Sequence, residues 1–229
     1  MSRLADFFDT GTIARLPIVA DLLTGNIQGL EYSYTSAHSI TITKGNCYDS
    51  FNLTVLTGSA SQVVAIGTTI NKVYNLFLCD DGLVKTDTDV DGATLLAGSV
   101  TALRWIGFVK TNSAGAICLF EMTSDILIFP KPSENRFVSP LISTTYTAYS
   151  VASLVPVLRV TGITIAGEFS VEQVEGVVSK DGVSDFTRFS GNSFGPGHEC
   201  QFVEGWYIKV PIVNYDNGYV VITKVTLKR

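Results

Sequence analysis

Short segments rich in β-branched and aromatic residues, separated by polar turns, run through the chain from residue 27 to residue 121. Glycines such as Gly45, Gly58, Gly82 and Gly115 lie in the intervening turns, where they interrupt any longer element. Closely spaced short strands with frequent turns predict an antiparallel β-sandwich. The expected strands are residues 30–34, 39–43, 51–57, 62–70, 73–79, 103–110 and 116–121.

In the second half of the chain, apolar residues alternate with other residue types over residues 206–212 and again over residues 219–228. A period of two indicates strands with one buried face. Asn217 and Gly218 lie between the two segments, and because this pair suits a tight turn with positive φ, we expect the two strands to pair directly as a hairpin. Residues 151–166 and 169–179 supply further strands, which predicts a second, jelly-roll-like sandwich.

The predicted fold is therefore all-β, with two antiparallel, jelly-roll-like β-sandwich domains. Residues 27–128 form the first sandwich and residues 136–229 the second, outward-facing one. Pro130 and Pro132 favour extended backbone between them, so residues 129–135 are predicted to be a linker.

A short helical arm is predicted at the N-terminus, in residues 1–26. Ser2 and Thr12 are candidate helix caps there, and Pro17 breaks any longer helix. The arm either docks on a neighbouring chain or packs on its own domain, and we favour docking.

Charged residues are scarce in this chain of 229 residues. They make up 16% of the sequence, against a usual value of about 25%, and the mean hydropathy is +0.30. A surface with so few charges is unusually neutral or is covered by other chains, which indicates an assembly subunit. The formal net charge is −5 and no basic run is present, so no nucleic-acid partner is expected. Residues 1–25 lack a long apolar stretch, so no signal peptide and no membrane partner are expected.

The cysteines and histidines do not predict a metal site, because none of them forms a CxxC or similar pair. We expect the cysteines to behave as small buried hydrophobic residues, and we expect no cofactor. The residues concerned are Cys47, Cys79, Cys118, Cys200, His38 and His198.

Two segments resemble catalytic or metal-binding motifs. Residues 191–195 match the GxSxG pattern of a nucleophile elbow, but Pro196 and Gly197 follow where its helix would begin, so we interpret them as a glycine-rich loop. Residues 87–92 copy the first half of an EF-hand loop, but Gly98 occupies the position of its bidentate carboxylate. They predict an acidic turn or a calcium site of another type.

No catalytic residues are predicted, and the chain is not expected to be an enzyme. Glu168, Glu172 and Glu175 form a close glutamate cluster, which we interpret as solvated strand or turn positions. A glycan-cleaving appendage would require two convergent carboxylates, which the sequence does not identify.

The second half is rich in aromatic residues. Two of its predicted loops, residues 186–198 and 215–219, could present aromatic side chains on a binding surface. Loops on a rigid scaffold commonly present binding residues, and aromatic rings stack on sugars. The candidate surface-binding residues are Tyr215, Tyr219, Phe194 and His198.

An ordered set of motifs lies in residues 74–79, the acidic turn, and residues 94–98, 103–111 and 113–120. It resembles a β module of tailed-bacteriophage virion proteins, notably tail fibres and related surface appendages. In that family a Y-x-L-F strand precedes an aspartate-rich turn, and an R-R-I-G-x-x-x-T-x-x-x-G-x-I-x-x-F hairpin closes the sheet. Here Trp105 replaces the second arginine and Cys118 lies within the last strand, and the likeness covers residues 27–125.

The resemblance implies a structural or receptor-binding role in the virion, commonly as a homotrimer and without a cofactor. The expected function is that of a tail fibre, appendage or decoration protein, with other virion proteins and a host cell-surface glycan as partners. The alternative is a soluble carbohydrate-binding module or adhesin that uses exposed tyrosines and Trp206 for stacking.

Overall fold

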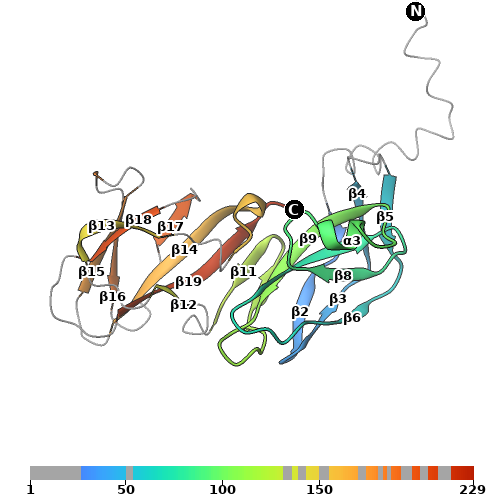
Figure 1. Cartoon of the computed structure of the whole chain (residues 1–229), viewed down its shortest axis with the longest axis horizontal. Helices are drawn as coiled ribbons and strands as arrows, with labels where there is room; N and C mark the ends of the chain where they lie inside the picture. Colours follow the sequence, from blue (N-terminus) through green and yellow to red (C-terminus); the bar gives the residue numbers. More distant parts are fainter. Residues whose placement is uncertain are drawn as a thin grey trace, which may run out of the picture.

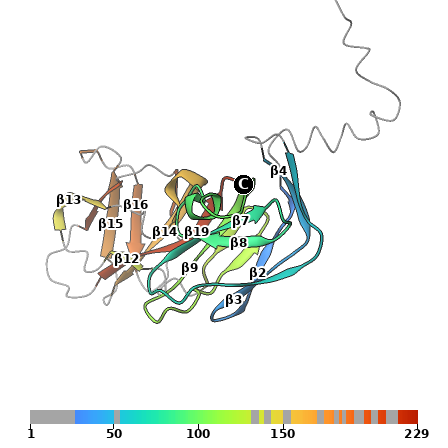
Figure 2. The same cartoon turned by 45° about the vertical axis from the view of Figure 1, so that its right-hand side comes forward.

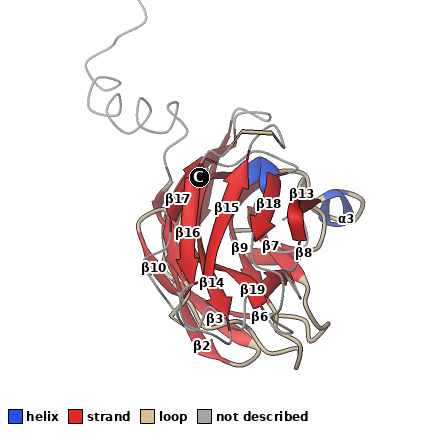
Figure 3. Cartoon of the chain, turned by 90° about the vertical axis from the view of Figure 1, so that its left-hand side faces the viewer, coloured by secondary structure: helices blue, strands red, loops and turns tan. Residues whose placement is uncertain are grey.

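The computed structural model describes residues 27–49 and 54–130 and shorter segments of the second half. The predicted N-terminal arm, residues 1–26, lies outside the described residues. All described strand pairs are antiparallel, and the only α-helix among the described residues is α3 (Ala93–Leu96), so the all-β prediction is confirmed (Figure 3). The described segments beyond residue 130 are 136–138, 143–149, 155–169, 174–179, 183–184, 187–191, 198–201, 206–210 and 218–229.

Three chain segments, each divided into two short strands, form an outer layer of two three-stranded sheets. The sheet orders are β1-β4-β5 and β2-β3-β6, so each segment contributes one strand to each sheet. This outer layer lies at one end of the molecule (Figure 1). Its strands are β1 (Gln28–Gly29), β2 (Tyr32–Ser36), β3 (Ser39–Ile42), β4 (Gly45–Asp49), β5 (Thr54–Gly58) and β6 (Gln62–Ala65).

A middle sheet packs behind the outer layer. It has the order β8-β7-β9, with β7 at Val73–Cys79, β8 at Val84–Asp87 and β9 at Leu103–Lys110. All residues from 74 to 79 and from 105 to 110 are buried, so the sheet is covered on both faces. Figure 2 shows it between the outer layer and the strands of the second half.

The outer layer and the middle sheet enclose the first part of the core. Ile40, Ile42 and Leu56 of the outer layer are almost fully buried, as are Leu76 and Leu78 of the middle sheet. In β5 the buried Leu56 and Gly58 alternate with exposed neighbours, as expected for strands with one face in the core.

Two long strands, β14 (Val160–Phe169) and β19 (Gly218–Leu227), form a ribbon that runs into the second half (Figure 1). They pair from Val160–Leu227 to Phe169–Gly218. The ribbon belongs to a larger sheet with the order β10-β11-β19-β14-β17, and a further strand, β12, also pairs with β19. The other strands of this sheet are β10 (Glu121–Thr123), β11 (Ile126–Ile128), β12 (Arg136–Val138) and β17 (His198–Gln201).

The predicted linker at residues 129–135 falls between two strands, β11 and β12, that both pair with β19. Phe129 is buried, and its N–H donates to the carbonyl of Thr223 at 2.9 Å. One hydrophobic cluster joins residues of the first half to Val155, Val160, Ile163 and Val225. The described core is therefore continuous across the predicted boundary.

The remaining described strands form a four-stranded sheet of order β13-β18-β15-β16. This sheet corrects the predicted hairpin, because β18 pairs with β13 and β15 whereas β19 pairs with β14, β11 and β12. A tight Asn-Gly turn needs strands that abut it, but residues 211–217 separate the end of β18 from the start of β19. Its strands are β13 (Ser143–Tyr149), β15 (Val174–Ser179), β16 (Thr187–Gly191) and β18 (Trp206–Val210).

Residues 116–121, predicted as a strand, form only an isolated bridge between Ile117 and Thr111, and β10 begins at Glu121. The N–H groups of Ile117 and Cys118 donate to carbonyls of different segments, those of Ala37 and Lys110. The two residues are buried in succession, so the segment lacks the alternation of a half-buried strand.

Candidate functional site

For two of the four candidate binding residues, His198 and Tyr219, the structure gives a strand and a register position. His198 pairs with Ile165 and Tyr219 with Glu168, so they lie in the two strands that flank β14 on opposite sides. Tyr215 and Phe194 lie outside the described residues. The role of these residues in binding a surface stays a prediction.

The acidic loop, residues 87–92, is built by carboxylates that accept hydrogen bonds from the backbone. Asp87 is buried, and its carboxylate accepts the N–H groups of Asp89, Thr94 and Leu95 at 2.9–3.2 Å. Burial alone would raise the pKa of Asp87, but these N–H donors bring it below its usual value. The loop therefore positions α3 through an ionised, internally bonded aspartate.

The next two aspartates are also engaged. Asp89 accepts the N–H groups of Asp91 and Ala93 at 2.8 and 3.2 Å, and Asp91 pairs with the guanidinium of Arg159 at 3.0 Å. Such turns are typical of aspartates that bond their own backbone. Within the described residues, no group of three or more His, Cys, Asp or Glu residues is arranged to hold a metal ion.

Behind the acidic loop, polar contacts connect it to the middle sheet and to the second half. Trp105 donates its indole N–H to the side-chain oxygen of Asn75 at 3.0 Å, and Asn75 donates to the carbonyl of Asp89 at 3.2 Å. Arg159, in the 3-10 turn η3 (Val157–Arg159), lies 6.0 Å from the centre of a Trp105 ring. A cation over an aromatic face is attracted to it, so Arg159 joins the two halves at this point.

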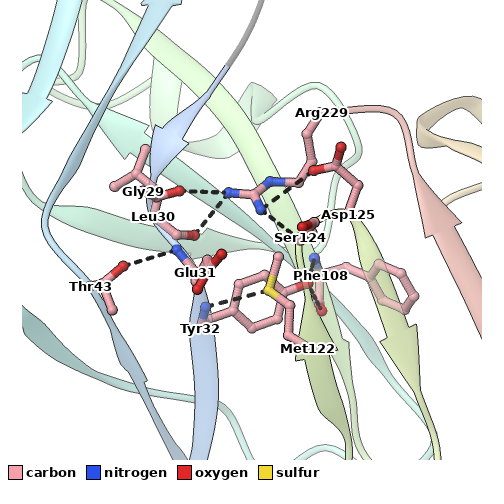
Figure 4. Close-up of polar contacts among 10 residues, drawn as sticks. All are labelled: Gly29, Leu30, Glu31, Tyr32, Thr43, Phe108, Met122, Ser124, Asp125 and Arg229. Atoms are coloured by element: carbon pink, nitrogen blue, oxygen red, sulfur yellow. Dashed lines mark hydrogen bonds and ion pairs between the residues drawn. The ribbon is translucent and has the colours of Figure 1, made fainter.

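A second polar cluster surrounds Arg229, directly after the ribbon (Figure 4). Its terminal nitrogens donate to the carbonyls of Ser124, Gly29 and Leu30 at 3.1, 3.2 and 2.9 Å, and one lies 3.6 Å from the carboxylate of Asp125. We call these three carbonyls and the carboxylate the carbonyl cage. Burial lowers the pKa of Arg229, but an arginine starts so high that it stays charged.

Sequence reasoning missed both arginines. For Arg229 a signal exists, because it continues the alternation of the buried residues Val225 and Leu227 onto the covered face. For Arg159 no local pattern points to a partner at residue 91. Both contacts depend on pairing of segments that are far apart in the sequence.

The cysteines whose side chains the structure describes behave as predicted: Cys47, Cys79 and Cys118 are buried thiols. Burial raises the pKa of the Cys47 thiol to about 12 and that of Cys79 to about 11. These thiols are therefore protonated at neutral pH and unsuited to nucleophilic chemistry.

Several large apolar side chains of the described residues lie in solvent. Val63 on the outer layer is 69% exposed, Leu158 of η3 is 66% exposed, and Val183 is 81% exposed. Val55, Ile70, Leu83 and Leu96 are also exposed. They lie on separate elements, and single exposed apolar side chains are common on folded proteins, so none of them defines a contact surface by itself.

No protein-family model, no curated protein and no solved structure matches this chain. Among the described residues, no helix has the length and apolar character needed to cross a membrane.

Proposed function

We propose that this chain is a structural component of a bacteriophage virion, a tail fibre, appendage or decoration protein, which acts by assembly and by binding the host surface. It forms a homo-oligomer, a trimer, and contacts other virion proteins. The ordered motifs of residues 74–120 support this proposal through their resemblance to tailed-phage virion modules. In this arrangement residues 1–128 attach to the particle or to sister subunits, and the second half faces outwards toward a host glycan.

The observation that carries the proposal is the exposure of Val63, Leu158 and Val183 on a chain with few charges. Obligate interfaces are more apolar than ordinary surface and bury more than about 2,000 Å² in total. Packing against sister chains would remove such side chains from water.

The oligomeric state is tested by light scattering of the purified chain at micromolar concentration. We expect the mass of a trimer, and a clean monomer near 25 kDa would contradict the proposal. Val63→Asp and Leu158→Asp place a charge on exposed positions, so any loss of oligomer without loss of the folded state identifies the interface. Ser113→Asp, which adds the same single charge at an exposed turn position, is the matched control.

The place in the particle requires a second experiment. Electron micrographs of phage particles labelled with an antibody to this chain are expected to show label on a tail fibre, an appendage or the head surface. Particles that carry the chain's gene but bind no antibody would contradict a virion role.

The alternative, a soluble carbohydrate-binding module, is favoured by one observation in the second half. Tyr149 and Trp206 are Cα partners in the register of β13 and β18, so two aromatic residues share one cross-strand position of this sheet. Trp105 is buried, so quenching of tryptophan fluorescence by acrylamide reports mainly on Trp206. Strong quenching that a glycan suppresses, in a monomeric protein, supports the alternative; a Trp206→Phe variant removes the signal and serves as the control.

A further inference from the structure

We propose that Arg229 is a conformational lock: its guanidinium, held in the carbonyl cage, keeps the junction between β1 and β2 in a kinked conformation. The lock couples the end of the ribbon to the first strand of the outer layer, β1. This inference rests on the described contacts and does not depend on the virion proposal.

The junction between β1 and β2 is strained. Gly29 has φ 69° and Leu30 has φ 55°, so two successive residues adopt the left-handed conformation. A side chain such as that of Leu30 makes this conformation unfavourable, and it persists only where the surroundings hold it. Leu30 is nonetheless 1% exposed, with its side chain in the core.

The neighbouring strand β4 approaches the same junction closely and also restricts it. A Cβ on Gly29 would lie 2.4 Å from the carbonyl oxygen of Lys44, and one on Gly45 would lie 2.2 Å from that of Gln28. The two glycines permit the strands to approach, but they do not by themselves orient the carbonyls of Gly29 and Leu30. Arg229 donates a hydrogen bond to each of those carbonyls, and so stabilises the orientation that the left-handed residues produce.

The third carbonyl of the cage comes from a turn with the same unusual backbone. Ser124, between β10 and β11, has φ 53° and directs its carbonyl at the other terminal nitrogen of Arg229. The next residue, Asp125, supplies the carboxylate, and its carbonyl accepts the N–H of Leu227 at 2.7 Å. The guanidinium therefore links β1, the β10–β11 turn and the end of β19.

Arginine suits this position better than lysine. The side chain of Arg229 is 4% exposed, and its planar fork reaches carbonyls of two segments at once. A lysine ammonium is a compact charge on a flexible stem and lacks this fixed geometry. We therefore expect Lys to restore only part of the lock.

Hydrogen exchange measured by mass spectrometry on the full-length chain tests the lock. In Arg229→Ala, amide exchange in residues 28–32 and 124–127 is expected to rise about tenfold or more, because bonds to a buried charged donor are lost. Exchange in β7, at the centre of the middle sheet, is expected to change little. Lys228→Ala, at the exposed neighbouring position, is the matched control.

Chemical rescue distinguishes a lock from a general packing role. Methylguanidinium chloride at low millimolar concentration is expected to restore protection in residues 28–32 of Arg229→Ala, whereas methylammonium chloride is not. The proposal is overturned if Arg229→Ala exchanges like the wild type in residues 28–32. It is also overturned if exchange rises equally in β7 and methylguanidinium restores nothing.

If Arg229→Ala does not fold, Arg229→Lys decides the question. Faster exchange confined to residues 28–32 and 124–127 supports the lock, and wild-type exchange there overturns it.

Discussion

Buried polar side chains add hydrogen bonds between layers whose core is otherwise apolar, and Tyr32 is the clearest example. Its hydroxyl donates to the carbonyl of Phe108 at 3.0 Å and lies 3.2 Å from the N–H of the same residue. One side chain of the outer layer thus serves both backbone groups of a residue in β9. Because the hydroxyl is fully buried, burial raises the pKa of Tyr32 far above its usual value.

The buried thiols are expected to be inert in the native protein. Reaction with a thiol-specific disulfide reagent at pH 8 should give at most one equivalent, from Cys200, because thiolates rather than thiols react and the other three cysteines are buried. All four cysteines should react in denaturant. Fast native reaction of two or more thiols would contradict the structure.

The same thiols predict a loss of stability at alkaline pH. Cys47 and Cys79 ionise near pH 9 in an unfolded chain but at about 12 and about 11 in the fold. The unfolded state therefore releases protons first, and stability, complete below pH 9, falls as the pH rises toward 11. Denaturant titrations should show a loss on the order of 3–5 kcal/mol by pH 11, with a contribution from each thiol. A flat profile from pH 8.5 to 11 would count against buried thiols.

Lys110 carries a buried charged side chain in β9. The residue is 3% exposed, and burial lowers the pKa of its ammonium. Lys110→Met should raise the free energy of unfolding by about 1 kcal/mol, because a side chain of similar length is buried without the cost of desolvating a charge. Lys85→Met, where the lysine pairs with Asp81 at 2.6 Å, should give no gain. A destabilised Lys110→Met would indicate a partner for the ammonium.

At the scale of elements, the packing of the outer layer on β9 depends on a glycine. A Cβ on Gly107 would lie 2.5 Å from the ring of Tyr32, so no side chain fits there. Gly107→Ala should displace Tyr32 from Phe108 and lower the free energy of unfolding by about 2–3 kcal/mol in a denaturant titration. Gly58→Ala is the control, because its Cβ would meet nothing closer than 3.5 Å. Equal stability of the two variants would argue against this packing.

Local pattern predicts some of these elements and not others. The runs 73–79 and 103–110 match β7 and β9 because they combine β-forming residues with glycine or polar boundaries. The strand β4, Gly-Asn-Cys-Tyr-Asp, has weak β propensity and forms because β1 and β5 flank it on both sides. The hairpin predicted at Asn217 and Gly218 is wrong for a similar reason: pairing with a strand distant in the sequence, β14, decides the place of β19.

At the scale of the whole molecule, the ribbon connects the two halves that Pro130 and Pro132 divide in the sequence. Arg159 precedes β14 and Arg229 follows β19, so both strands of the ribbon are fixed to the first half at the same end. The carbonyl of Arg159 also accepts the N–H of Lys228 at 2.8 Å, so a backbone hydrogen bond joins the segments that carry Arg159 and Arg229. The partly exposed Arg159–Asp91 pair contributes little, and the buried Arg229 contributes most.

The ribbon predicts that the first half does not fold independently. A fragment of residues 1–130 lacks β19, so β11 loses its partner, Leu127 and Phe129 lose Val225 and their other apolar neighbours, and the carbonyl cage loses Arg229. Each loss exposes apolar surface or removes a charged donor from the carbonyls of the cage. Differential scanning calorimetry should show no cooperative transition for the fragment at temperatures where the full chain is native. A fragment that melts cooperatively near the full chain's Tm would show instead that the boundary at residues 129–135 separates two independent domains.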